Sequence, residues 1–333
     1  MRQRPPTIDD IVAAADRIAR HVWRTPVVPS HWLSELTGGE VWLKLEIVQS
    51  TGSFKIRGAM NAMARLRLTR PDLEAVTTAS AGNHGIALAT AGAAFGVKVR
   101  VHLPATAPEI KKRAIRRLGA VILEAPTYDA AEERAQEETA GGRITFVSAY
   151  SDSDVIAGAG TAALEMVADL PQLDTLIVPL GGGGLLSGTA IVARARLERA
   201  LIIGAEADAS PVFTGALAAG RPVPVVVHDT LADGLAGNME PDSQTFGIVR
   251  DLVDRVVRVP EQAIGRAMRD IAERDRLLTE GAAATAVGAI GVLLESGLSL
   301  SGRRIGIILS GRNGDGSVFH SNPQVGDRSQ PKN

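Results

Sequence analysis

The chain has 333 residues, of which 45% are hydrophobic, so it can bury a large core in one big domain or two ordinary ones. Basic and acidic residues nearly balance, with a formal charge of -1, which argues against nucleic acid and favours a small-molecule ligand. No apolar run approaches the roughly 18 to 20 residues that span a bilayer, so we expect a cytoplasmic protein without a membrane role. The absence of cysteine excludes disulfides, cysteine-ligated zinc and thiol catalysis.

The amino-terminal region predicts a helix and then a strand. Thr7 is a suitable N-cap, and apolar residues recur at helical spacing from Ile8 to Val22. Further along, apolar and polar residues alternate over 41–47, the two-residue period of a strand with one buried face. This strand leads toward a motif around Lys55.

Apolar strands alternate with helical stretches over the rest of the chain, and such βα repeats imply parallel, doubly wound sheets. Glycines at 96 and 119 follow helical runs where a left-handed cap is favourable. Nine strands would be many for one open sheet, so we expect an α/β fold with two open, mostly parallel twisted sheets, flanked by helices around a ligand cleft. The strands after 41–47 are expected at 75–78, 97–103, 120–124, 144–147, 175–180, 201–205, 253–259 and 304–309.

A run of glycines from Gly181 to Gly184 follows the strand at 175–180 and precedes a helical stretch. Such a loop brings backbone N–H groups close to a phosphate at a helix amino terminus, although a tight turn explains it equally well. The run lacks the Gly-Lys-Ser/Thr ending of a nucleotide-binding P-loop. It also departs from Gly-x-Gly-x-x-Gly, so a dinucleotide is only the second choice.

Three further motifs carry candidate chemistry. Lys55 lies in Ser53-Phe54-Lys55-Ile56-Arg57-Gly58, and a lysine that is desolvated there would be a nucleophile or a base. The turn 80–84, Ser-Ala-Gly-Asn-His, could hold a carboxylate at a helix amino terminus. Ser310 begins a similar turn after the last strand. Each motif alone also fits an ordinary surface lysine or loop.

Taken in chain order, these motifs resemble the threonine/serine dehydratases, a branch of the tryptophan-synthase-β-like, fold type II pyridoxal-phosphate enzymes. The resemblance covers about residues 7 to 320 and includes 154–161, 232–235 and 280–283. It implies that pyridoxal 5'-phosphate is bound by Lys55 as a Schiff base. The other implied cofactor contacts are Phe54 at the ring, Asn83 at the phenolic oxygen, Gly181, Gly182, Gly183, Gly184 and Leu185 at the phosphate, Glu280, and Ser310 at the pyridine nitrogen. The implied substrate contacts are Ser80, Ala81, Gly82, Asn83 and His84.

The resemblance also implies an organisation. A large cofactor-binding domain would comprise 1–74 and 152–320, and a small mobile domain at 75–151 would close over the substrate. Residues 321–333 would form a flexible tail, and the enzyme would be a homodimer. The implied reaction is α,β-elimination, which converts a β-hydroxy amino acid to a 2-keto acid and ammonia.

Departures from the family pattern leave the substrate open. Arg312 stands where the family usually has glycine, and the stretch 148–151, Ser-Ala-Tyr-Ser, replaces His-Pro-Phe-Asp. Threonine, serine and a bulkier β-hydroxy amino acid all stay as candidates.

Several other functions, and a metal site, are alternatives to elimination. Racemases that resemble this chain use a serine where Ala81 stands, and a methyl group cannot donate a proton, so racemisation should be minor. A β-replacement synthase, a nicotinamide-dependent dehydrogenase and a non-catalytic amino-acid sensor are further alternatives. Glu206 and Ser210 are weak candidates for a divalent cation, because Val212 replaces the second carboxylate of relatives, and we expect no metal.

Overall fold

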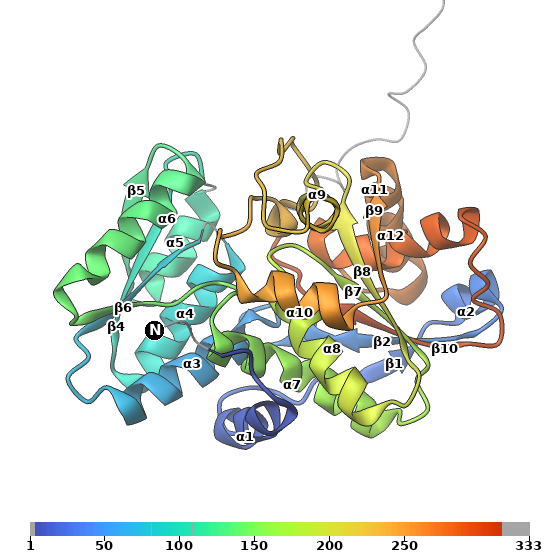
Figure 1. Cartoon of the computed structure of the whole chain (residues 1–333), viewed down its shortest axis with the longest axis horizontal. Helices are drawn as coiled ribbons and strands as arrows, with labels where there is room; N and C mark the ends of the chain where they lie inside the picture. The colour runs from blue at the N-terminus through green and yellow to red at the C-terminus, as the bar shows by residue number, and fades with distance from the viewer. Residues whose placement is uncertain (1–3, 81, 108, 315–333) are drawn as a thin grey trace, which may run out of the picture.

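The computed structural model describes residues 4–80, 82–107 and 109–314 (Figure 1). Its strands form two mostly parallel sheets, so the predicted α/β class is confirmed. The six-stranded sheet has the order β1-β2-β10-β7-β8-β9, and the four-stranded sheet has the order β5-β4-β3-β6. The larger sheet consists of β1 (Val27–Pro29), β2 (Glu40–Leu45), β7 (Thr175–Pro179), β8 (Leu201–Ala207), β9 (Arg255–Val259) and β10 (Arg304–Leu309). The smaller sheet consists of β3 (Ala75–Ala79), β4 (Lys98–Pro104), β5 (Val121–Ala125) and β6 (Ile144–Phe146).

Helices cover both sheets (Figure 1). The α-helices are α1 (Ile8–Ile18), α2 (His31–Thr37), α3 (Lys55–Thr69), α4 (Asn83–Phe95), α5 (Glu109–Arg117), α6 (Tyr128–Glu137), α7 (Ser153–Asp169), α8 (Gly184–Arg196), α9 (Val212–Ala219), α10 (Gln244–Leu252), α11 (Glu261–Asp270) and α12 (Gly281–Glu295). The short helices are η1 (Glu46–Val48), η2 (Glu138–Gly141), η3 (Asp233–Leu235) and the π-helix η4 (Ile271–Asp275). Within the described ranges, no helix is long and apolar enough to cross a membrane.

All nine predicted strands are present, with ends shifted by one or two residues. Thr7 caps α1 as expected, because its side chain accepts a hydrogen bond from the backbone N–H of Asp10 in a capping box. Gly96 and Gly119 have left-handed φ values of 66° and 81°, which confirms their role as helix caps. The sequence did not predict β1, since three residues are too short to show a period.

The order of the strands explains where a site can form. The carboxy-terminal strand β10 lies between β2 and β7 and runs parallel to both, with Leu309 opposite Leu45. The carboxyl ends of these three strands therefore meet at one edge, where ligands bind in open α/β sheets. The chain continues from these ends into the predicted motifs of Lys55, Ser310 and Gly181.

Helix α3 lies beside the four-stranded sheet, next to α4 (Figure 1). Its buried residues Ile56, Ala59 and Met63 belong to the same apolar cluster as Val76 of β3 and Val101 of β4. The core of the four-stranded sheet therefore includes a helix that precedes residue 75. The tail expected at 321–333 lies outside the described residues.

Candidate active site

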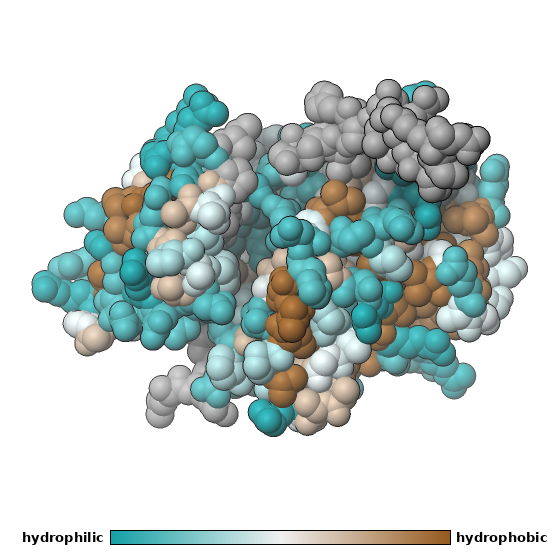
Figure 2. All heavy atoms as spheres, turned by 90° about the horizontal axis from the view of Figure 1, so that it is seen from above, coloured by the Kyte–Doolittle hydropathy of each residue, from teal (hydrophilic) through white to brown (hydrophobic). Residues whose placement is uncertain are grey.

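A cavity of about 570 Å³ lies between the two sheets and contains the predicted motifs. In the space-filling view from above, the surface is hollowed between the two parts of the molecule (Figure 2). The predicted residues that line it are Phe54, Lys55, Ser80, Gly82, Asn83, His84, Gly181, Gly182, Gly183, Gly184, Leu185, Glu280 and Ser310. Ala81 lies outside the described residues. Such a volume is typical of a pocket for a small ligand or cofactor.

Lys55 is the first residue of α3, and its side chain reaches the cavity. Its Nζ donates a hydrogen bond of 2.7 Å to the carbonyl of Ala149 and lies 5.2 Å from the centre of the Phe54 ring. Burial lowers the pKa of Lys55 to about 8, and the charge of Glu280 opposes this shift. The amine is therefore closer to its reactive neutral form than a surface lysine is.

The loops that carry Lys55 and Ser310 are joined by backbone contacts. The N–H of Phe54 donates to the carbonyl of Ser310 at 2.9 Å, and Ser53 forms an antiparallel bridge with Gly311. The side chain of Ser310 is buried at the cavity wall. The two motifs, more than 250 residues apart in sequence, are thus fixed relative to each other.

A second polar group joins α4 to the carboxy-terminal loops. Asn83 donates through Nδ2 to Glu280 Oε1 at 2.8 Å and accepts from Asn313 Nδ2 at 2.7 Å. The backbone N–H of Asn313 donates to Glu280 Oε2 at 3.0 Å. Burial raises the pKa of Glu280, although the hydrogen bond from Asn83 opposes this. A primary amide has two N–H donors, so Asn83 can still offer one to a ligand.

The glycine loop is packed too closely for side chains. A Cβ added to Gly182 would lie 2.3 Å from the ring of Tyr150, and Gly183 has a left-handed φ of 89°. Helix α8 begins at Gly184, and the first amides of a helix have no intrahelical acceptor. These amides, at the positive end of the helix, can hold a phosphate.

The turn after β3 fixes the hydrogen bonds of Ser80 and the protonation state of His84. Ser80 Oγ accepts hydrogen bonds from the N–H groups of Gly82 and Gly85 at 3.3 and 3.1 Å, so it shapes the turn. Burial, and next the charge of Lys55, lowers the pKa of His84 to about 3. His84 is therefore neutral at ordinary pH. It is the second residue of α4, which begins at Asn83.

Several contacts at the site were not predicted. Lys111 of α5 and Asp233 of η3 both line the cavity and form an ion pair of 2.6 Å. The hydroxyl of Tyr150 accepts a hydrogen bond from the N–H of Glu240 at 2.8 Å. The carbonyl of Ala149 has no sequence signature, because every residue has one. The Lys111 pair joins segments 122 positions apart, a pairing that no local pattern reveals.

The candidate cation position is used for another purpose in this structure. The carboxylate of Glu206 accepts the backbone N–H groups of Phe213 and Thr214 at 2.9 and 3.0 Å, and thereby caps α9. Ser210 Oγ accepts the N–H of Gly237 at 3.3 Å. Across the described parts of the chain, no three His, Cys, Asp or Glu residues are grouped to hold a metal ion.

Comparisons with known proteins agree with this geometry. The family described as pyridoxal-phosphate dependent enzyme matches residues 18–311. L-threonine ammonia-lyase of Thermotoga maritima is 39% identical over 93% of this chain and 76% of its own length. L-threo-3-hydroxyaspartate ammonia-lyase of Saccharomyces cerevisiae is 36% identical over 93% of this chain and 94% of its own. The crystal structure of serine racemase from Dictyostelium discoideum superposes with a TM-score of 0.85 at 36% identity, covering 93% of this chain and 99% of that one.

Proposed function

The chain belongs to the family of pyridoxal-phosphate-dependent enzymes, and we propose that it is a dehydratase that converts a β-hydroxy amino acid to a 2-keto acid and ammonia. The observation that carries this proposal is the cavity where Lys55, Asn83, the glycine loop and Ser310 meet. An amine, an amide, a row of free amides and a hydroxyl converge there from separate segments.

The residues of the cavity fit pyridoxal phosphate. Lys55 would hold the aldehyde carbon covalently, and Asn83 would donate its second amide hydrogen to the phenolic oxygen. The amides at the start of α8 would hold the phosphate. Ser310 would place a neutral hydroxyl at the ring nitrogen. The bound cofactor supplies an electron sink for the carbanion left after proton removal.

Lys55 is the residue that we assign to proton transfer. Lys55 would become a free amine once the amino group of the substrate has replaced it on the cofactor. With a pKa of about 8, part of that free amine would be neutral near pH 7.5 and could accept the α-proton of the bound amino acid. No acid is required on the opposite face for elimination. Ser310 would offer the ring nitrogen a neutral hydroxyl, which is a weaker proton source than a carboxylic acid, and this would favour elimination over transamination.

We propose that the substrate is a small β-hydroxy amino acid. Its carboxylate would bind at the turn 80–84 and the amino terminus of α4. Threonine, serine and a bulkier analogue are all included, since the named relatives act on threonine and 3-hydroxyaspartate. We also propose that residues 75–151 close over the substrate and that the enzyme is a cytoplasmic homodimer. The cleft between the two sheets supports the closing motion.

The proposal is tested by reduction and by assay. The protein loaded with pyridoxal phosphate is treated with borohydride, and peptide mapping should find the cofactor on Lys55. Lys55→Ala should lose this adduct and lower keto acid release from threonine or serine by about a thousandfold. The control is Lys98→Ala, because Lys98 is an exposed lysine on β4. An adduct on another lysine, or keto acid release by a loaded Lys55→Ala protein, would contradict the proposal.

A further inference from the structure

Helix α3 carries a second cationic residue close to Lys55, on its opposite side. Residues two positions apart on an α-helix point about 200° away from each other. Lys55 faces the cavity, whereas Arg57 is 0% exposed and lies in the core. A buried guanidinium is costly unless every donor is satisfied, so its partners show what the residue does.

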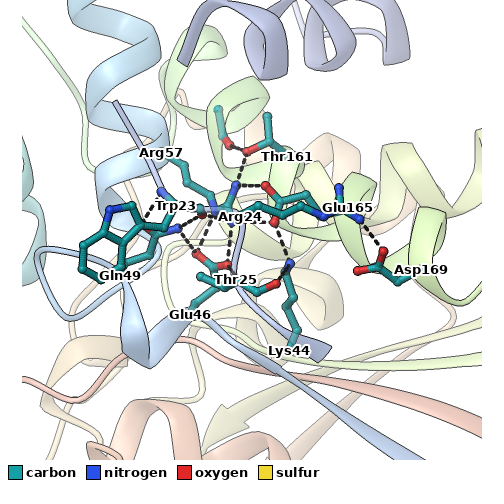
Figure 3. Close-up of polar contacts among 11 residues, drawn as sticks. Trp23, Arg24, Thr25, Lys44, Glu46, Gln49, Arg57, Thr161, Glu165 and Asp169 are labelled. Atoms are coloured by element: carbon teal, nitrogen blue, oxygen red, sulfur yellow. Dashed lines mark hydrogen bonds and ion pairs between the residues drawn. The ribbon is translucent and has the colours of Figure 1, made fainter. Parts of the chain in front are cut away.

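Every polar side of the Arg57 guanidinium has a partner (Figure 3). Its Nε and Nη2 donate to the two oxygens of Glu46 at 2.7 and 2.8 Å. Its Nη1 and Nη2 donate to the two oxygens of Glu165 at 2.7 and 2.8 Å. Two weaker bonds, of 3.1 and 3.2 Å, reach Thr161 Oγ1 and the carbonyl of Trp23. This double bidentate arrangement restricts both the rotation and the position of the side chain.

The partners of Arg57 come from separate elements of the fold. Glu46 begins η1 after strand β2, and Glu165 lies on α7. Lys44 of β2 completes the group, since its Nζ lies 2.6 Å from Glu165 and 2.8 Å from the carbonyl of Thr25. The group of Lys44, Glu46, Arg57 and Glu165, called here the charge quartet, contains two cations and two carboxylates and is therefore balanced.

We infer that Arg57 is a positioning residue for Lys55, because the charge quartet fixes the first turn of α3 to β2, η1 and α7. Arg57 does not line the cavity. Arg57 would act by fixing the backbone of α3, because that backbone sets the direction in which the side chain of Lys55 points. A displacement of about 1 Å at a reacting group can reduce a rate by about a hundredfold. The inference rests on the proposed role of Lys55.

The charged groups around Lys55 determine how the reactivity of Lys55 depends on pH. On the cavity side they are Glu280 at the start of α12, Asp229, and the pair of Lys111 and Asp233. The titratable side chains of Tyr128 and Tyr150 and the neutral His84 of α4 also line the cavity. On the core side is the charge quartet, whose formal charges cancel. A substitution that keeps the charge of Arg57 should thus leave the pH midpoint of Lys55 reactivity unchanged.

The test uses Arg57→Lys, which keeps the charge but cannot form two bidentate contacts. Apoprotein is mixed with pyridoxal phosphate, and the rate of covalent adduct formation is followed by absorbance from pH 6 to pH 10. We expect the high-pH rate to fall by about tenfold or more with the midpoint unchanged. The matched control is Arg65→Lys on the same helix, where Arg65 is about half exposed and pairs with Asp154 at 3.4 Å, and its rate should stay within about twofold.

The outcomes separate three explanations. If wild type forms no adduct on Lys55, the proposed function fails. If wild type forms it and Arg57→Lys does so at the same rate, with only a lower melting temperature, Arg57 is merely structural and the inference is overturned. A shifted midpoint with an unchanged high-pH rate would also overturn it, since the role of Arg57 would then be electrostatic.

If Arg57→Lys does not fold, Thr161→Val serves as the test, because it removes one hydrogen bond to Arg57 and keeps the ion pairs. A rate that falls by more than the roughly twofold allowed for the Arg65→Lys control supports the inference, and a rate within that range overturns it.

Discussion

Buried carboxyl groups on the two sides of α3 have opposite surroundings. On the core side, Glu46 and Glu165 contact Arg57, and Glu165 also contacts Lys44. Burial would raise the pKa of Glu165, but the hydrogen bonds and charge of Arg57, with Lys44, lower it. On the cavity side, Glu280 contacts Asn83 and Asn313, and no cation in the described parts of the chain lies within ion-pair distance of it. Burial therefore raises the pKa of Glu280.

The difference separates a structural charge from a charge available to chemistry. The carboxylates of the charge quartet form ion pairs with buried side chains of the same fold, so they hold structural elements together. Glu280 is held by amides, which orient a carboxyl group without neutralising it. Its charge remains free to act on Lys55, whose pKa it raises. The core side of α3 should then govern stability and the position of Lys55, and the cavity side should govern the protonation of Lys55.

The largest expected effect is on stability, in a matched pair of substitutions. Glu165→Gln leaves two buried cations with one carboxylate, and it should lower the free energy of unfolding by about 3 kcal/mol. Glu280→Gln strands no cation, and it should cost about 1 kcal/mol or less. Chemical denaturation of the two variants and of wild type measures both values. Equal losses would show that the two sides of α3 do not differ in this way.

A smaller effect is expected on the pH dependence of Lys55. The negative charge of Glu280 raises the pKa of Lys55, so Glu280→Gln should lower that pKa from about 8 by up to about one pH unit. The neutral amine then forms at lower pH, and the midpoint of adduct formation with pyridoxal phosphate should move in the acidic direction. Glu295→Gln is the control, since Glu295 is exposed at the far end of the same helix. A midpoint that moves to higher pH would contradict the assigned sign.

The smallest effect concerns the choice of reaction. Racemisation needs a proton donor on the face opposite Lys55, for which the resembled racemases use a serine at the position of Ala81, and a methyl group cannot donate a proton. Ala81→Ser adds a hydroxyl, so the share of recovered serine with inverted configuration should rise by a few-fold, even if total turnover falls. Chiral chromatography of the residual substrate measures this share. Comparable inversion by wild type and variant would show that residue 81 does not control the reaction.

Local sequence patterns predicted most of the strands and several helix caps. The alternation at 41–47 and the apolar runs identified nine strands, and helix caps at Thr7 and Gly96 followed from side-chain and backbone preferences. The short edge strand β1 was missed because three residues show no period. Among the site residues, the ordered motifs singled out Lys55 and Asn83. Their neighbours Ala149 and Asn313 were not assigned roles, since a carbonyl and a loop amide have no distinctive pattern.

The sequence by itself determined which chemical groups are present and which segments become strands, helices and tight turns, because these depend on residues a few positions apart. Only the tertiary structure decided which of these groups lie next to one another. Strand β10 enters between β2 and β7, and this order brings Ser310 to Lys55. The same packing places Glu165 on Arg57, 108 residues away in the chain, and places Glu280 beside the amides of Asn83 and Asn313. A pKa depends on burial and on the nearest charges, so it is a property of this packing and cannot be read from the motif that contains the residue.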